Sequence, residues 1–524
     1  MKFLAKMKEK QMQRKLGGIL CGLLCAGVLV MPSAWAADYY GNDGNTKQLT
    51  GANVSLDSGN YDAVYGGYDD TEVSLPEVFK NNVTITGTAA TNIVCGAYSF
   101  YGNVRENTVT ISGNTLGNVV CGGGTGAADA IKNHVIIKAN SVVNANVAGG
   151  VAVKGNSEGN TVRIIKSSAA NVFGGKGDTN SKGNSVEISE GTIKDTVYGG
   201  YADNDKNGSA EKNEVAIGAG SVVEGNIYGG YATHNTNENK VSITNGAEVG
   251  QSVFGGFSEK ADSKNNEVIL NGDSGVTANI AGGVALKGNS EDNKVNIAKS
   301  TVNMNVYGGY GAKDSIGNII SITDGSSVNK NVYGGYSFKG NSMDNTVTID
   351  NSTVNENVYG GYTESDGAIS EKIQNNKVIF KNGAKIKGDV YGGYDKLSKA
   401  NITNNTLEVV GKDNEAKSIQ NFDKLNFFIT KDLIANDTML KVTDTALINN
   451  AEIKAGVELG TKLNENDKIN LITAGALKAE NITTGTLTDG LINIDKGIKV
   501  AIGPDGNKLV GVIHGTTPPG GGGT

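Results

Sequence analysis

The residues of this chain that are best suited to contact a ligand are aromatic, and they recur at a nearly constant spacing. The candidate binding residues occupy one slot of successive repeats and are Tyr198, Tyr228, Tyr307, Tyr333, Tyr359 and Tyr391. Each follows a valine or isoleucine, so an extended chain that turns the aliphatic side chain inward turns the ring outward. Exposed aromatic rings can bind sugars and protein surfaces through their faces. The row predicts either an exposed binding strip or a column of rings that stabilises the fold by stacking.

Two cysteines occupy the slot of these tyrosines in consecutive repeats. Cys95 and Cys121 each replace the aromatic residue that comes directly before the first glycine of a repeated motif. If consecutive repeats stack in register, the two Cα atoms lie ~4.8 Å apart, within the ~4.4–6.8 Å that a disulfide bond requires. The spacing predicts either a disulfide between Cys95 and Cys121, which an oxidising compartment favours, or two stacked thiols.

The acidic residues and histidines show no spacing that is typical of a catalytic or metal site. Asp69-Asp70 is the one suggestive pair of adjacent acids, and it lies in a predicted loop, where solvated charge is the simpler interpretation. His134, His234 and His514 share no spacing of metal ligands. We therefore predict no catalytic residues, no metal and no cofactor, and we predict that the protein is not an enzyme.

These residues belong to a repeat that occupies most of the chain. A motif such as Gly334-Gly335-Tyr336 begins at thirteen positions that are 25 to 32 residues apart, most often 26. The first glycines are at 66, 96, 122, 149, 174, 199, 229, 255, 282, 308, 334, 360 and 392. A fixed period of this length indicates a solenoid. The glycine pair predicts a sharp corner, or a positive φ, where a side chain would clash with the next coil.

A second motif, Asn followed by alternating polar and aliphatic residues, runs in step with the first. Its asparagines are at 81, 107, 133, 160, 184, 213, 239, 266, 293, 318, 345, 376 and 405. The alternation predicts a half-buried strand, and Asn at a corner predicts a ladder of stacked amides. With a third short segment per repeat, we predict a single-stranded, right-handed parallel β-helix of about thirteen coils of ~26 residues, with three short strands per coil.

Insertions predict where recognition loops lie. The longest repeats place their extra residues between the glycine pair and the asparagine, in 68–80, 201–212 and 362–374. We therefore expect these loops at one corner of the solenoid, where a rigid scaffold usually carries its binding residues.

The first 36 residues have the features of a secretory signal. A basic start, an apolar run and the sequence Ala34-Trp35-Ala36 predict cleavage after Ala36. Cleavage removes six basic residues and one acid, which changes the formal charge from −7 to about −12. An acidic chain that retains only Arg105 and Arg163 as arginines is a poor partner for nucleic acid. No later segment is apolar enough to cross a bilayer, so we predict no transmembrane segment after signal cleavage.

The order of these parts resembles the passenger region of a bacterial autotransporter adhesin. The predicted parts are a signal peptide at 1–36, an N-terminal cap at 37–60, β-helix repeats at 61–410, a β-rich C-terminal cap at 411–515 and a Pro/Gly linker at 516–524. The resemblance implies that 411–515 acts like a folding nucleus. It also implies secretion through export machinery, display at the cell surface (with the outer membrane if a β-barrel is supplied), and a role in virulence.

That resemblance implies an adhesin that binds a cell-surface glycan or protein through loops and aromatic strips of a β-helical rod. Two alternatives remain open. A polysaccharide lyase or hydrolase on a β-helix would need paired carboxylates on adjacent coils. An inert structural spacer or surface-coat scaffold would need only the stacked coils themselves.

Overall fold

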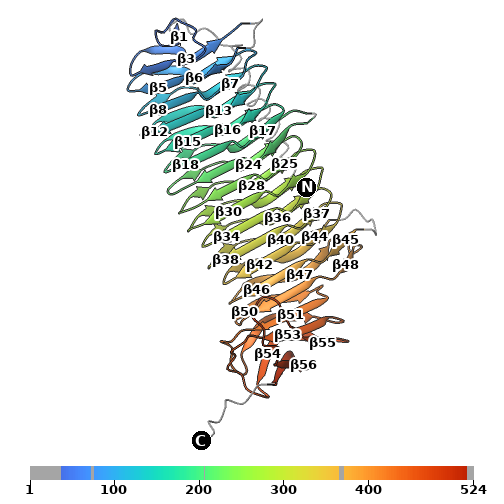
Figure 1. Cartoon of the computed structure of the whole chain (residues 1–524). Helices are drawn as coiled ribbons and strands as arrows, with labels where there is room; N and C mark the ends of the chain where they lie inside the picture. The colour runs from blue at the N-terminus through green and yellow to red at the C-terminus, as the bar shows by residue number, and fades with distance from the viewer. Residues whose placement is uncertain (1–36, 72–75, 206, 365–370, 516–524) are drawn as a thin grey trace. The chain divides into compact units, whose positions relative to one another are not determined.

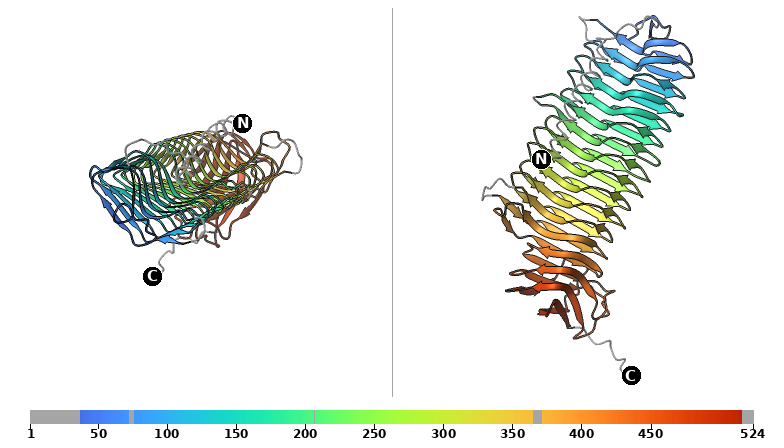
Figure 2. Two further views of the ribbon diagram at one scale, coloured as in Figure 1. Left: turned by 90° about the horizontal axis from the view of Figure 1, so that it is seen from above. Right: turned by 180° about the vertical axis from the view of Figure 1, so that it is seen from behind.

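The computed structural model describes residues 37–71, 76–205, 207–364 and 371–515, and in these residues the regular elements are β-strands, with no helix. The chain divides into two compact units, an N-terminal unit up to Lys260 and a C-terminal unit from Ala261. In each unit the strands follow one another in chain order as turns of a parallel β-solenoid (Figures 1 and 2). The predicted fold class is therefore confirmed.

One turn contributes strands to three parallel sheets, which we name A, B and C. In the C-terminal unit a turn runs from β42 (Thr346–Asp350) in sheet C to β43 (Thr353–Val354) and β44 (Val358–Thr363) in sheet A. It ends with β45 (Lys372–Gln374) in sheet B. In several turns the two sheet A segments are one continuous strand, such as β47 (Lys385–Asp395). The predicted three strands per coil thus correspond to three sheets.

Identical slots of successive turns pair in register. In the N-terminal unit Val135 pairs with Val109 in the preceding turn and with Val162 in the following turn, and all three side chains are buried. The threonines beside Val109 are half-buried and point to the opposite face. Each buried aliphatic side chain of such a file contributes roughly 1.5–3 kcal/mol. Residues at the same position of successive repeats therefore lie one above another and form a column along the solenoid.

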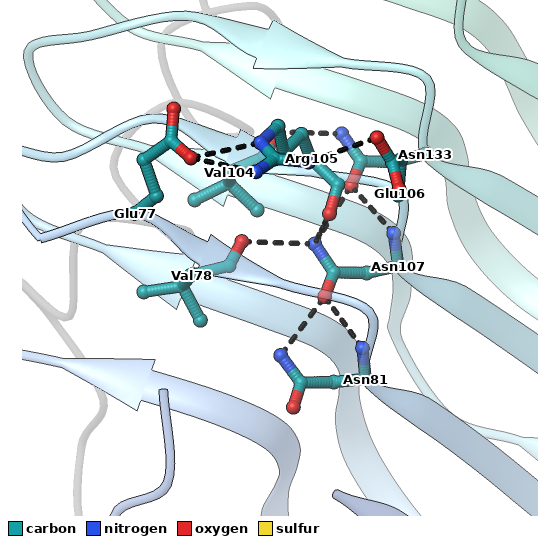
Figure 3. A network of polar contacts seen from close by, with 8 residues as sticks. All are labelled: Glu77, Val78, Asn81, Val104, Arg105, Glu106, Asn107 and Asn133. Atoms are coloured by element: carbon teal, nitrogen blue, oxygen red, sulfur yellow. Dashed lines mark hydrogen bonds and ion pairs between the residues drawn. The ribbon is translucent and has the colours of Figure 1, made fainter. Parts of the chain in front are cut away.

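The asparagine ladder predicted from the sequence is present in both units. In the N-terminal unit the backbone N–H and the side-chain Nδ2 of Asn81 both donate to Oδ1 of Asn107, at 3.0 and 2.9 Å (Figure 3). Asn107 donates to Asn133 in the same way, at 3.2 and 2.9 Å, and its Nδ2 also bonds the carbonyl of Val78. The ladder asparagines are at most 1% exposed. Because their amide groups are hydrogen-bonded, their burial is tolerated.

The glycine pair lies inside a strand of sheet A, so the predicted corner with a positive φ is wrong. Gly334 and Gly335 are both within β40 (Val332–Ser337), and neither has a positive φ. The glycines are required instead because a side chain at either position would clash with neighbouring atoms, as was also predicted. A Cβ atom at Gly334 would meet the carbonyl oxygen of Gly360 in the next turn, and one at Gly335 would meet the side-chain amide of Asn345. The glycines leave the space that the ladder occupies, which is why the two motifs recur in step.

The corner between sheets B and C is a tight turn of constant length. The residue before each ladder asparagine has a left-handed φ, between 51° and 67°. Lys132, for example, has a φ of 51°, and its N–H donates to the carbonyl of Glu158 in the next turn at 2.8 Å. A left-handed φ outside glycine costs about 1–2 kcal/mol, and the bond between turns offsets this cost. Left-handed residues such as Lys166 and Glu190 also follow sheet C.

Insertions enter at the third corner, between sheets A and B, as predicted. They connect β3 to β4 and β20 to β21 in the N-terminal unit, and β44 to β45 in the C-terminal unit. The bounds are β3 (Asn60–Asp69), β4 (Val78–Phe79), β20 (Val197–Ala202) and β21 (Ser209–Glu211). Of these predicted loops, residues 72–75, 206 and 365–370 lie outside the described residues. The A–B corner is thus the corner that carries the largest insertions.

The solenoid continues past the last glycine pair, so it has about 16 turns and not the predicted thirteen. Parallel pairing extends sheet A from β47 to β54 and sheet C from β49 to β55 (orange to red in Figure 1). The bounds are β49 (Thr406–Val410), β50 (Asn414–Gln420), β51 (Lys424–Ile429), β52 (Thr438–Leu447), β53 (Glu452–Val457), β54 (Lys468–Lys478) and β55 (Thr483–Thr486). These turns lack both motifs, so the period alone could not predict them.

After the last glycine pair, other side chains take the places of the motif residues. Asn405 is the last ladder asparagine, and its N–H donates to the carboxylate of Asp423 at 3.1 Å. Phe422 is 4% exposed and lies over Gly392. The hairpin of β56 (Lys499–Asp505) and β57 (Lys508–His514) then adds to β54 in antiparallel orientation. The predicted domain limits stay predictions.

Replacing Asn345 with alanine will lower the free energy of unfolding by about 2–4 kcal/mol, because two buried donors lose their acceptor. Those donors are the N–H and Nδ2 of Asn318, each 3.0 Å from Oδ1 of Asn345. Urea denaturation followed by circular dichroism measures the change. Asn303→Ala is the control, since Asn303 is exposed and accepts one bond, from Asn329. Equal losses for the two variants would contradict a ladder that stabilises the fold.

Gly335→Ala will destabilise the protein by about 1–3 kcal/mol, since the new methyl group overlaps the amide of Asn345. The matched control is Gly503→Ala, because a Cβ atom at Gly503 meets no heavy atom within 4 Å. Thermal unfolding of both variants compares them. A Gly335→Ala protein as stable as the control would show that the glycine pair has another role.

Candidate functional site

The candidate site is the outer face of sheet A, which carries two columns of aromatic rings in each unit. The first column is the slot before the glycine pair, and the second column is the slot after it. First-column aromatics are Tyr65, Phe173, Tyr198, Tyr228 and Phe254 in the N-terminal unit, and Tyr307, Tyr333, Tyr359 and Tyr391 in the C-terminal unit. Second-column aromatics are Tyr68, Tyr98, Tyr201, Tyr231 and Phe257, and then Tyr310, Tyr336, Tyr362 and Tyr394.

Contacts between the rings place both columns on one face. Val332 is fully buried in the core, so the next residue, Tyr333, points to the opposite side of the sheet. Tyr336 follows the glycine pair and meets Tyr333 edge to face, with ring centroids 5.5 Å apart and planes at 82°. The two columns therefore support each other laterally, in the T-shaped geometry that aromatic pairs favour.

Along each column the rings stack face to face. In the C-terminal unit Tyr333 lies 5.0 Å from Tyr307 and 4.9 Å from Tyr359, with planes within 5° of parallel. Tyr359 and Tyr391 continue the stack at 5.1 Å. Each such contact contributes about 0.5–1.5 kcal/mol beyond the area it buries. The stacking interpretation of the aromatic row is thus realised in the structure.

In the N-terminal unit the columns are interrupted. Phe173, Tyr198, Tyr228 and Phe254 stack at 4.9 to 5.1 Å. The preceding slots of the first column hold Cys95, Cys121 and Ala148, and those of the second hold Gly124, Val151 and Lys176. Aromatic stacking is therefore a local device of some turns and not a requirement of every turn.

The six candidate tyrosines all lie in the first column, but their ring faces are largely occupied. Tyr198, Tyr228 and Tyr359 are buried, and Tyr307, Tyr333 and Tyr391 are half-buried. Where rings stack on both sides, the parts of a half-buried tyrosine that remain accessible are its edge and its hydroxyl. Ligand binding by these residues stays a prediction, and it would use ring edges and hydroxyls more than ring faces.

Burial makes these phenols weak acids. It raises the pKa of Tyr310 and of Tyr359 to about 12, although the Tyr359 hydroxyl accepts a bond from Nδ2 of Asn357 at 3.2 Å. Burial also raises the pKa of Tyr336, and a hydrogen bond to Glu364 raises it further. Glu364 in turn pairs with Lys396 at 3.4 Å. Tyr310, Tyr336 and Tyr359 are therefore neutral throughout the physiological pH range.

The two cysteines lie at paired positions, as the period predicted. Cys95 in β6 (Ala90–Ser99) pairs in register with Cys121 in β10 (Val119–Thr125), and both side chains are buried. Adjacent parallel strands bring such Cα atoms to ~4.8 Å, a separation that a disulfide allows. The disulfide stays a prediction.

The two acids of the first insertion bond residues of their own turn and of the neighbouring chain. Asp69 is 3% exposed and accepts hydrogen bonds from the N–H and hydroxyl of Thr71, and from the hydroxyl of Ser99 at 2.9 Å. Asp70 forms an ion pair with Lys47 at 2.5 Å. Both acids thus have structural partners. The prediction that the protein is not an enzyme remains open.

The histidines lie apart. Nδ1 of His134 is 2.7 Å from the hydroxyl of Thr161, and burial lowers the pKa of His134. Nδ1 of His514 is 2.9 Å from Glu465. His234 lies in the turn after β24 (Ile227–Ala232). Within the described ranges, no three His, Cys, Asp or Glu side chains form a group that could hold a metal ion. The same part of the chain contains no helix that could cross a bilayer.

One feature of the surface was not predicted. Lys287, Lys313 and Lys339, which we name the lysine row, occupy the same position in three successive turns at the A–B corner of the C-terminal unit. All three are exposed. The signal was present in the sequence, because each lysine is four residues after the second glycine of its pair. Aligning the repeats by their glycines would have found the row.

Comparison of the chain with protein-family models gives no match, and comparison with curated proteins gives none.

Raising the pH from about 10 to 12 will destabilise the protein. The pKa values of Tyr310 and Tyr359 are raised from 10.0 to about 12 in the folded state. Their contribution to stability is thus complete below pH 10 and is lost as the pH rises through about 12. Thermal unfolding against pH, with phenolate absorbance measured in parallel, tests this. Ionisation of every tyrosine near its ordinary pKa with no loss of stability would contradict burial of the columns.

Proposed function

We propose that this chain is an adhesin-like passenger that is secreted or displayed on a bacterial surface and binds a cell-surface glycan or protein. In this proposal residues 1–36 are a cleaved signal peptide, and export machinery delivers the chain as it does the autotransporter passengers that the sequence resembles. Binding, and not catalysis, is the activity. The contacts come from the A–B corner and from the half-buried tyrosines of sheet A.

The observation that supports this proposal most is the difference between the corners. The B–C corner has one left-handed residue in each turn and a hydrogen-bonded ladder beside it, so its length is constant. The A–B corner differs in length and composition from turn to turn. Variable loops on a rigid scaffold are the usual arrangement of a recognition surface.

A second candidate function is a structural spacer or surface-coat scaffold. It is favoured by the stacking of Tyr307, Tyr333, Tyr359 and Tyr391, because rings that cover one another stabilise the solenoid and present little face to a ligand. A spacer would need the columns and the ladder but no particular residues at the A–B corner.

A binding screen of the purified full chain against cultured cells, glycans and matrix proteins separates the two functions. The adhesin is expected to bind at least one of these surfaces. Tyr333→Phe/Tyr391→Phe should then weaken that binding about 5–150-fold, because each of the two lost hydroxyls removes a hydrogen bond worth about 0.5–1.5 kcal/mol. Tyr61→Phe is the control, since Tyr61 lies outside both columns. Absence of binding by the unmodified chain would favour the spacer.

A further inference from the structure

Two tyrosines of the second column in the N-terminal unit form a stacked pair that the register of sheet A holds in place. Tyr201 in β20 pairs in register with Tyr231 in β24. Their ring centroids are 5.1 Å apart, and the angle between the ring planes is 3°. The two phenol rings therefore stay in contact as long as the two strands stay paired.

Each phenol of this pair bonds a carboxylate that lies two residues past the second column. The hydroxyl of Tyr231 donates to Oε1 of Glu259, which follows Phe257 in the next turn. Asp203 accepts a hydrogen bond from the hydroxyl of Tyr201, and burial and Asp203 both raise the pKa of Tyr201. Burial raises the pKa of Asp203 as well, which makes it a better proton acceptor. Since oxidation of a phenol removes a proton together with an electron, both tyrosines have a proton acceptor in place.

The residues on either side of the pair cannot take part in the same chemistry. Phe257 stacks on Tyr231 with ring centroids 5.4 Å apart, and Nζ of Lys176 lies 5.5 Å from the ring centroid of Tyr201. Tyr201 is half-buried, so its edge is open to an oxidant in solution, whereas Tyr231 is 9% exposed and contacts the ring of Tyr201. Within the second column, each tyrosine of the pair thus has the other as its stacked phenol.

We propose that Tyr201 and Tyr231 are a site of oxidative cross-linking, at which a one-electron oxidant joins the two rings by a carbon–carbon bond. The oxidant is hydrogen peroxide activated by a haem peroxidase. The bond ties two successive turns together and restricts the unfolded chain in the way that a disulfide does. The inference does not depend on whether the chain binds a cell surface, because the reaction needs no ligand.

The atoms and electrons of the reaction balance. Each phenol gives one electron to the oxidant and one proton to its carboxylate, which is Asp203 for Tyr201 and Glu259 for Tyr231. The two phenoxyl radicals couple through carbons ortho to their oxygens. The hydrogen on each coupled carbon then moves to the phenolic oxygen, which restores both aromatic rings. The two electrons and two protons that leave the pair reduce one hydrogen peroxide to two waters.

The test oxidises the purified full chain at low concentration with hydrogen peroxide and a haem peroxidase. Dityrosine fluorescence follows the rate, and mass spectrometry of a tryptic digest identifies the linked peptides. The expected product joins Tyr201 to Tyr231 with the loss of two hydrogen atoms. The internal control is the pair Tyr333 and Tyr359, which stacks at 4.9 Å but has the amide of Asn357 and not a carboxylate at the Tyr359 hydroxyl. A positioned proton acceptor typically contributes ~10²–10⁴-fold, so the control pair should cross-link at least about tenfold more slowly.

Three variants separate the pair from its proton acceptors. Tyr231→Phe keeps a ring in the stack and is expected to abolish the product. Glu259→Gln is expected to slow its formation at least about tenfold, because the amide accepts the hydrogen bond but does not take the proton. Tyr101→Phe is the matched control and should leave the rate unchanged, since Tyr101 lies against Phe100 outside both columns. Circular dichroism shows whether each variant is folded.

Three results would overturn the inference. Cross-links that form only between chains would show that the stacked pair does not react within one molecule. Hydroxylated tyrosines without any carbon–carbon bond would show that the two radicals do not couple. Equal rates at Tyr333–Tyr359, or an unchanged rate in folded Glu259→Gln, would show that the carboxylates take no part. If Glu259→Gln does not fold, the comparison of the two pairs in the unmodified chain decides.

Discussion

The packing of a side-chain amide against two glycines is the interaction on which this structure depends. Gly335 has no Cβ atom, so the amide of Asn345 can lie against the strand and still bond the asparagines of both neighbouring turns. This arrangement allows a single register, because a shift by one residue would place a side chain where the amide lies. Every other column of the molecule follows from that register, including the aromatic stacks, the paired cysteines and the lysine row.

The same constraint separates the parts of a turn that are invariant from those that can vary. The ladder asparagine and the left-handed residue before it use their polar groups to join successive turns, so an insertion there would break bonds in both directions. At the A–B corner the bonds between turns lie beside sheet B, as between Asn180 and Asn156, and the number of residues before them differs from turn to turn. Extra residues therefore cost little more than loop entropy there, which grows slowly with length. The largest insertions therefore lie at this one corner.

Much of the fold could be predicted because its signals are local. Alternating residues such as Val109 and Ile111 predict a strand by themselves, and the repeated asparagine predicts the ladder. The glycine pair was misread because a clash with the next turn and a sharp corner both select glycine, and the period does not distinguish them. The left-handed position was missed because Lys132 has no intrinsic preference for it. The last turns were missed because Asp423 and Phe422 replace the motifs there with unrelated residues.

The aromatic columns are a consequence of the register and not its cause. Stacked tyrosines stabilise one another, since each ring offers its face to the next, and Tyr333 stacks on both Tyr307 and Tyr359. Where the same slot holds Cys95, Cys121 or Ala148, the strands still pair in register. The asparagine ladder continues through those turns, so the ladder and not the rings keeps successive turns aligned.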